Sequence, residues 1–334
     1  MSHLLEMLGR GLGGNIGETL ARYYWSPDHK PLEQLRDLCN QHPDWPDVNF
    51  QLGLHYLREM DADGAIASLG TACKHKPDYL AARLALAAAY EEKGDLTHAM
   101  EHLRVANQLQ AGEPAVLFAI GYCSEKLRQP QQAAEYYRDA ISKQATFTAA
   151  RERLAAVAIV LGLTDEAIEQ YEALAADRPQ EGWIRTALAH LHFRAGKFGK
   201  AVESFETAIA MEPANWSLVD DEVEALVADG QIREAIERLN GLIEQQGPFA
   251  DLHLRLGDLY SQIGDDEQAT RNYLAARENQ PNYLEAAVKT GTHHMTFGRW
   301  DQAAEAFLEA TELNDNLLVN YVGMGVAQYR ANKR

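Results

Sequence analysis

Apolar and small residues recur along this chain with a period of 34 residues. The strictest position holds alanine in eight successive periods, with no insertion or deletion between them. These alanines are Ala65, Ala99, Ala133, Ala167, Ala201, Ala235, Ala269 and Ala303. A fixed period of about 20–50 residues is typical of tandem repeats, in which each supersecondary unit buries its apolar face against its neighbours. The pattern therefore predicts a repeat array.

Two further positions keep the same register. A large apolar or aromatic residue stands four positions after each alanine, and a small residue stands twelve positions before it, except at Val223. The large residues are Leu69, Leu103, Tyr137, Tyr171, Phe205, Leu239, Tyr273 and Phe307, and the small ones are Gly53, Ala87, Gly121, Ala155, Ala189, Gly257 and Gly291. A large side chain facing a small residue lets two helices joined by a tight turn pack closely.

Glycine and proline mark where the two helices of each repeat should end. Glycine recurs five positions before the alanine, at Gly94, Gly162, Gly196, Gly230, Gly264 and Gly298. There it can provide the left-handed cap that ends the first helix of a repeat, here called helix A. Proline closes several repeats, at Pro77, Pro179, Pro213 and Pro281. Because proline cannot continue a helix, it ends the second helix, here called helix B.

The segment Leu256-Gly257-Asp258-Leu259-Tyr260, followed by Ala269, Tyr273, Ala276 and Pro281, resembles the consensus of the tetratricopeptide repeat (TPR). Eight such repeats begin at residues 46, 80, 114, 148, 182, 216, 250 and 284. The resemblance implies an all-α fold, a right-handed TPR superhelix (α-solenoid) of antiparallel helix pairs. We expect an N-terminal segment with a degenerate helix pair (1–45), eight TPR units (46–317) and a C-terminal capping helix (318–334).

Composition narrows the class of partner. The formal net charge is -18 and the sequence pI is about 5.1. Because such a surface repels phosphates, we expect no nucleic acid and no membrane as partner. A basic protein partner or simple solubility accounts for the charge. Free thiols at Cys39, Cys73 and Cys123, with no signal peptide, favour a cytoplasmic location.

Motifs for chemistry are weak. Gly9-x-Gly11-x-x-Gly14 has the spacing of a dinucleotide-binding loop, but the strand that must precede it is missing. His98 and His102 lie four residues apart on a predicted helix, with no third metal ligand nearby. No credible Ser-His-Asp or Cys-His set stands in a motif. We therefore expect no catalytic, metal or cofactor-binding residues, no cofactor, and no enzymatic activity.

The sixth repeat departs from the pattern. Glu222 stands where most repeats have an aliphatic residue, and Val223 replaces the small one. Asp220, Asp221 and Glu224 flank them. One interpretation is a rotated or loosened helix with solvated carboxylates. The other is an acidic patch for a partner that carries lysine or arginine, because burying an unpaired charge is costly.

The resemblance implies that helix A residues line a concave groove that binds a peptide or a helix. The predicted groove residues are Phe50, Leu54, Leu84, Phe118, Tyr122, Trp183, Phe193, Asp220, Glu224 and Asp258. They change from apolar in the N-terminal half to acidic in the C-terminal half, which fits a protein or peptide with apolar and basic segments. The alternative is that some of them pack against neighbouring helices or against the N-terminal segment.

These observations favour a non-catalytic protein- or peptide-binding scaffold or adaptor. A second class is an architectural TPR protein that assembles into homo-oligomers. A third is the regulatory TPR region of an enzyme complex.

Overall fold

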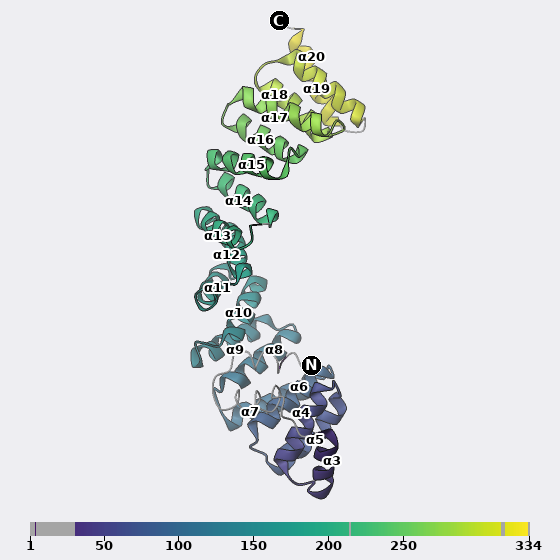
Figure 1. Ribbon diagram of the computed structural model, residues 1–334, viewed down its shortest axis with the longest axis vertical. Helices are drawn as coiled ribbons and strands as arrows, with labels where there is room; N and C mark the ends of the chain where they lie inside the picture. Colours follow the sequence, from purple (N-terminus) through teal and green to yellow (C-terminus); the bar gives the residue numbers. More distant parts are fainter. Residues whose placement is uncertain (1–3, 5–30, 214, 315–317, 333–334) are drawn as a thin grey trace. The chain divides into compact units, whose positions relative to one another are not determined.

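In a computed structural model, the described residues are Leu4, 31–213, 215–314 and 318–332. Every regular element in these ranges is an α-helix, which confirms the predicted all-α class. The chain divides into two compact units, Met1–Ala195 and Gly196–Arg334. In each unit, helices that follow one another in the chain lie side by side (Figure 1).

The first unit holds α3 (Leu32–Gln41), which packs against α4. Its A helices are α4 (Pro46–Arg58), α6 (Leu80–Glu92), α8 (Pro114–Lys126), α10 (Thr148–Leu161) and α12 (Gly182–Arg194). Its B helices are α5 (Ala62–His75), α7 (Leu96–Leu109), α9 (Pro130–Lys143) and α11 (Thr164–Asp177). Each A helix begins at the first residue of a predicted repeat.

The second unit continues the alternation. Its A helices are α14 (Trp216–Ala228), α16 (Ala250–Gln262) and α18 (Leu284–Thr296). Its B helices are α13 (Phe198–Met211), α15 (Ile232–Gln246), α17 (Asp266–Asn279) and α19 (Trp300–Leu313), and α20 (Leu318–Ala331) packs against α19. The division of the chain at 1–45, 46–317 and 318–334 stays a prediction.

Local sequence explains several helix starts. Asp61, Asp95 and Asp265 precede B helices and accept a hydrogen bond from the backbone N–H three residues later, at N···O distances of 2.9, 3.2 and 3.1 Å. Proline occupies the first helical position of α4, α8 and α9, where its missing N–H costs no hydrogen bond. These caps satisfy amides that a helix N-terminus leaves unpaired.

The predicted seam between helices A and B is the core of each repeat. All eight alanines of the register are fully buried. A Cβ atom added to Gly257 would lie 2.6 Å from Cδ1 of Tyr273, and one added to Gly121 would lie 2.8 Å from Cε1 of Tyr137. The aromatic ring of helix B thus rests directly on the helix A backbone, which leaves no room for a side chain.

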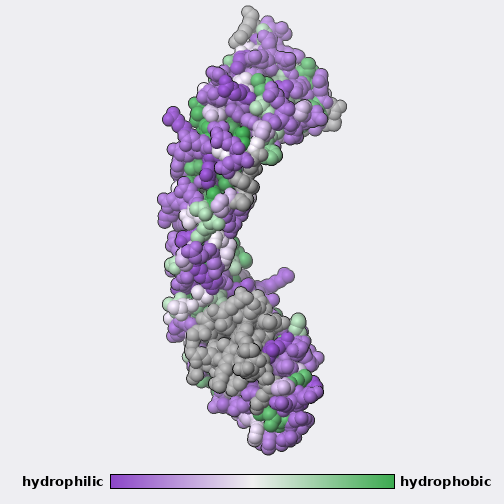
Figure 2. Space-filling model, in the orientation of Figure 1, coloured by the Kyte–Doolittle hydropathy of each residue, from purple (hydrophilic) through white to green (hydrophobic). Residues whose placement is uncertain are grey.

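Surfaces outside the seam are mostly polar. On the face visible in Figure 2, hydrophilic side chains predominate and hydrophobic ones are scattered among them. Cys73 and Cys123 are buried and Cys39 is partly buried, and burial raises the pKa of the Cys73 thiol to about 11. A bilayer crossing requires a helix that is both long and hydrophobic. None of the described helices combines the necessary length and hydrophobicity.

Parts of the N-terminal predictions lie outside the described residues. These are the glycine motif at 9–14 and the part of the expected degenerate helix pair that falls within residues 5–30. Leu4 is described, and it is buried in the same apolar cluster as Phe50 and Leu54.

We expect Gly257→Ala to lower the free energy of unfolding by about 1–3 kcal/mol, the usual cost of overpacking. Gly241→Ala is the matched control, because a Cβ there, inside α15, meets nothing within 4 Å. That control should raise the free energy by about 0.5–1 kcal/mol, since alanine is the better helix former. Urea unfolding followed by circular dichroism measures both, and equal effects would contradict this packing.

Two repeats lack the capping glycine, which gives a second test. Met60 and Arg128 occupy that position with left-handed φ angles of 62° and 58°. We expect Met60→Gly to stabilise the protein by about 1 kcal/mol, because a non-glycine residue is strained there. Little packing is lost, since Met60 is 72% exposed. Gly94→Ala should have the opposite effect in the same thermal melts, and a destabilised Met60→Gly protein would refute the argument.

Candidate protein-binding site

The predicted apolar groove residues of the first unit are core residues in the structure. Their exposed fractions do not exceed 1%; they are Phe50, Leu54, Leu84, Phe118 and Tyr122. The Phe118 ring lies 5.5 Å from that of Tyr137 and 5.0 Å from that of Phe147, centroid to centroid. A partner could reach these side chains only if the residues that cover them moved aside. Their role in binding stays a prediction.

Trp183 is the exposed aromatic residue among the predicted groove positions, with 47% of its surface accessible. Its indole Nε1–H donates a hydrogen bond to Oε2 of Glu181, with an N···O distance of 2.8 Å. Its ring and that of Tyr171 are nearly perpendicular, with centroids 6.1 Å apart. Phe193, on the same helix α12, is partly buried. Trp183 is therefore held in place while much of its ring remains available for contact.

The acidic groove positions lie on α14 and α16 of the second unit, and two of the three are paired within the chain. Asp220 forms an ion pair with Arg255. Asp258 accepts hydrogen bonds from Lys289 Nζ at 2.6 Å and from the Tyr273 hydroxyl at 2.8 Å. These pairs reduce the acidity that the sequence predicts for this surface.

Two adjoining depressions lie along this surface and share Asp258 and Gln262. The first, about 350 Å³, is lined by Val223, Glu224, Val227, Ala228, Arg255, Asp258, Leu259 and Gln262. The second, about 290 Å³, is lined by Asp258, Ser261, Gln262, Tyr273, Lys289, Thr292, His293 and Thr296. Glu224 is exposed at the first, with no ion pair in the described part of the chain. The A helices α14, α16 and α18 thus form a hollowed surface with charges of both signs.

Ser261 and His293, which line the second depression, form with Asp266 a serine–histidine–aspartate contact that no sequence motif revealed, because the three residues come from three helices. Ser261 Oγ lies 2.9 Å from Nδ1 of His293, and Nε2 of His293 lies 2.9 Å from Oδ1 of Asp266. Arg299 also pairs with Asp266. Burial raises the pKa of Asp266, but the hydrogen bond from His293 and the charge of Arg299 outweigh it and hold the pKa below its usual value.

This trio has the residue types of a hydrolase, but the surroundings of Ser261 and His293 in the described residues suit a structural role better. Ser261 lies within α16, whose N–H groups are used in the helix, so its own turn offers no amide pair to stabilise an oxyanion. The His293 ring is almost fully buried. The geometry of the three residues suits a buried polar network that joins α16, α17 and α18.

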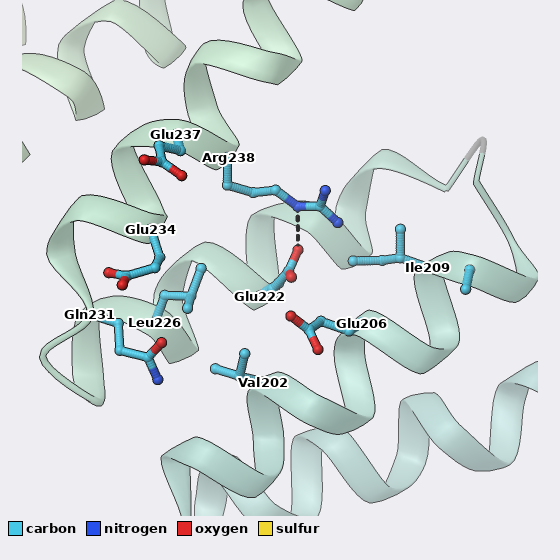
Figure 3. A pocket seen from close by; sticks show the side chains of 10 residues that line it. Val202, Glu206, Ile209, Glu222, Leu226, Gln231, Glu234, Glu237 and Arg238 are labelled. Carbon is cyan, nitrogen blue, oxygen red and sulfur yellow. Dashed lines mark hydrogen bonds and ion pairs between the residues drawn. The ribbon is translucent and has the colours of Figure 1, made fainter.

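A cleft of about 530 Å³ lies where α13, the B helix of the fifth repeat, meets α14 and α15 of the sixth (Figure 3). It is lined from α13 by Val202, Glu206, Ile209 and Ala210, from α14 by Glu222 and Leu226, and from the start and body of α15 by Gln231, Glu234, Glu237 and Arg238. The lining therefore combines four carboxylates and one guanidinium with apolar side chains at the base of the cleft. The groups of three potential metal ligands that a bound ion requires do not occur among the described residues.

Glu222 lies at the bottom of this cleft with only 3% of its surface exposed. Its Oε2 accepts a hydrogen bond from Arg238 Nε at 2.6 Å. Burial raises the pKa of Glu222 and Glu206 adds to the rise, while the bond and charge of Arg238 oppose it, and the net shift is upward. The expected solvated carboxylate is therefore wrong for Glu222. Arg238, sixteen residues away on the facing helix, makes the burial tolerable.

A tetratricopeptide repeat family model matches residues 50–114, 125–181, 186–218 and 254–316, more than half of the chain. The chain belongs to the tetratricopeptide repeat family. Proteins of this family generally act as protein-binding scaffolds.

Two curated TPR proteins are similar to parts of this chain. "TPR repeat-containing protein YpiA" of Bacillus subtilis is 24% identical over 272 residues, 79% of this chain and 63% of that protein. "TPR repeat-containing thioredoxin TTL4" of Arabidopsis thaliana is 29% identical over 80 residues, 24% of this chain and 12% of that one. This TPR chain thus spans less than two thirds of either relative.

Among solved structures, a chain of "Structure of Naa15/Naa10 bound to HypK-THB" superposes with a TM-score of 0.67. The alignment covers 82% of this chain and 43% of the other at 12% identity. At that identity the likeness shows the TPR fold alone.

The family match passes over residues 219–253. That gap contains most of α14 and all of α15, including Glu222 and Arg238. Most of the residues that line the acidic cleft therefore lie in this unmatched stretch, whereas its α13 wall lies within a matched one.

We expect Glu222→Leu, which restores the aliphatic residue of most repeats, to stabilise the protein by about 1–3 kcal/mol at neutral pH. The folded-state pKa of Glu222 lies above its ordinary value of 4.5. The stability that protonated Glu222 contributes is therefore fully present below pH 4.5, the ordinary pKa. It is lost as the pH rises through the raised pKa of the folded state. The gain from leucine should then grow from acidic to neutral pH, as urea titrations at several pH values would show.

The control for this substitution is Glu305→Leu, at an exposed glutamate of α19. It should leave stability nearly unchanged at every pH. A destabilised Glu222→Leu protein would show that the ion pair with Arg238 outweighs the cost of burial. A gain that does not change with pH would show that burial does not raise the pKa of Glu222.

Proposed function

We propose that this TPR chain is a non-catalytic scaffold or adaptor that binds a protein or peptide along its A helices. The observation that supports it best is the pair of adjoining depressions on α14, α16 and α18. Ligand sites are concave and combine apolar lining with a few placed polar groups, and this surface has both.

The chemistry of the surface indicates what kind of segment it would accept. Val223, Val227 and Leu259 provide apolar area in the first depression, and Glu224, which has no ion pair among the described residues, provides a negative charge beside it. A segment that carries one apolar and one basic side chain matches that arrangement. Arg255 and Lys289 can meanwhile donate to the backbone carbonyls or carboxylates of the same segment.

In the first unit, Trp183 is the residue we propose as an anchor. A half-exposed tryptophan whose indole is already oriented by a hydrogen bond is typical of binding hot spots, because little conformational entropy is lost on contact. An adaptor that works in the cytoplasm also accords with three free thiols.

The test compares affinity capture from a native lysate by wild type, Glu224→Lys and Trp183→Ala, followed by measured affinities for each captured protein. The proposal expects one or both variants to lose partners, with at least about tenfold weaker binding. Glu312→Lys, an exposed charge reversal on α19, is the control and should capture as wild type does. Equal capture by all four proteins would place the binding site away from the A helices.

A further inference from the structure

The sixth repeat breaks the packing rule that the other repeats obey. The position of Glu222 is aliphatic in six of the other seven repeats, at Leu52, Leu86, Ile120, Leu154, Leu188 and Leu256. A buried ion pair at such a position usually contributes less stability than an aliphatic side chain. Departures from local packing rules that have no structural benefit are expected at functional sites.

The cleft above Glu222 has two walls from successive B helices, α13 and α15, and a floor from α14 (Figure 3). Glu206 lies on the α13 wall, and Glu234 and Glu237 lie on the α15 wall. All three side chains are exposed. Val202 and Leu226 lie between the two walls, and both are buried. The cleft therefore has an acidic rim and an apolar floor.

The charges in the cleft do not cancel. Arg238 is the one basic side chain in the lining, and its Nε is bonded to Glu222. Glu206, Glu234 and Glu237 form no ion pair in the described part of the chain. This contrasts with Asp220 and Asp258 on the A helices, which are paired. Three uncompensated carboxylates around an apolar floor attract cations with a long alkyl stem.

We infer that this cleft is a second docking surface, which receives lysine or arginine side chains from a segment of a partner protein. The methylene stems would lie on Val202, Ile209 and Leu226, and the charged heads would reach Glu206, Glu234 and Glu237. The surface differs from the depressions of the proposed function, because it is built on the B helices α13 and α15. Its carboxylates are spread along two walls rather than converging, which fits several basic side chains better than one metal ion.

The test uses the full chain and a fluorescein-labelled synthetic peptide in which lysine alternates with serine, measured by fluorescence anisotropy. The double variant Glu234→Lys, Glu237→Lys should bind it at least about tenfold more weakly than wild type. Glu206→Gln should also weaken binding, because it removes the carboxylate of the opposite wall. The matched control is Glu305→Lys, Glu312→Lys, which changes net charge equally at exposed sites on α19 and should bind as wild type does.

A second peptide tests the apolar floor. Replacing each lysine by 2,3-diaminopropionate keeps the charges and removes most of each stem, and should weaken binding several-fold. Equal weakening by the cleft variant and the α19 control would overturn the inference, since general acidity would then explain binding. Equal affinity for the two peptides would also overturn it, as would spermine binding more tightly than the lysine peptide. Glu224→Lys should leave this binding unchanged, so failure here is distinct from failure on the A helices.

Discussion

In seven of the eight repeats the large residue of helix B faces a glycine or alanine of helix A, and this contact determines how the repeat is built. The large residue is leucine, tyrosine or phenylalanine, so its identity varies while the close fit remains. Tyr273 on Gly257 and Phe307 on Gly291 leave no space for even a methyl group. Because a single helix pair cannot bury its apolar face, this seam and its neighbours hold the array together.

Because the seam tolerates so little change, the residues that differ most between repeats lie on the other faces of the helices. In the first unit the A-helix positions next to the seam carry large apolar residues, and these bury themselves in the core. In the second unit some of the same positions carry charges, at Asp220, Glu224 and Asp258, and two of these pair from one repeat to the next through Arg255 and Lys289. Glu224, and Glu206, Glu234 and Glu237 in the cleft around Glu222, form no ion pair in the described part of the chain, and these are the charges that we propose for contact with a partner.

The period of 34 residues predicted the helix class and the seam, because both depend on spacing within one repeat. It could not predict contacts that depend on how successive repeats stack. Phe50 and Phe118 were predicted to line the groove, with packing against other parts of the chain as the alternative, and they are buried in the structure, since their exposure is decided by what packs above them. The pairing of Asp220 with Arg255 joins residues 35 positions apart, and the Ser261–His293–Asp266 network joins three helices. The Glu222–Arg238 pair was equally hidden, although the misplaced glutamate signalled that the sixth repeat is unusual.

The seam maintains the fold, and we propose that departures from it provide the binding surfaces. Hydrogen exchange of the full chain, read by mass spectrometry with and without the lysine peptide, tests this most directly. Without peptide, the account predicts slow exchange along the α16–α17 seam and faster exchange in α14 and α15. With peptide, exchange should slow in α13, α14 and α15 and stay unchanged in α17 and α19. Protection spread evenly over all helices, or confined to α17 and α19, would contradict it.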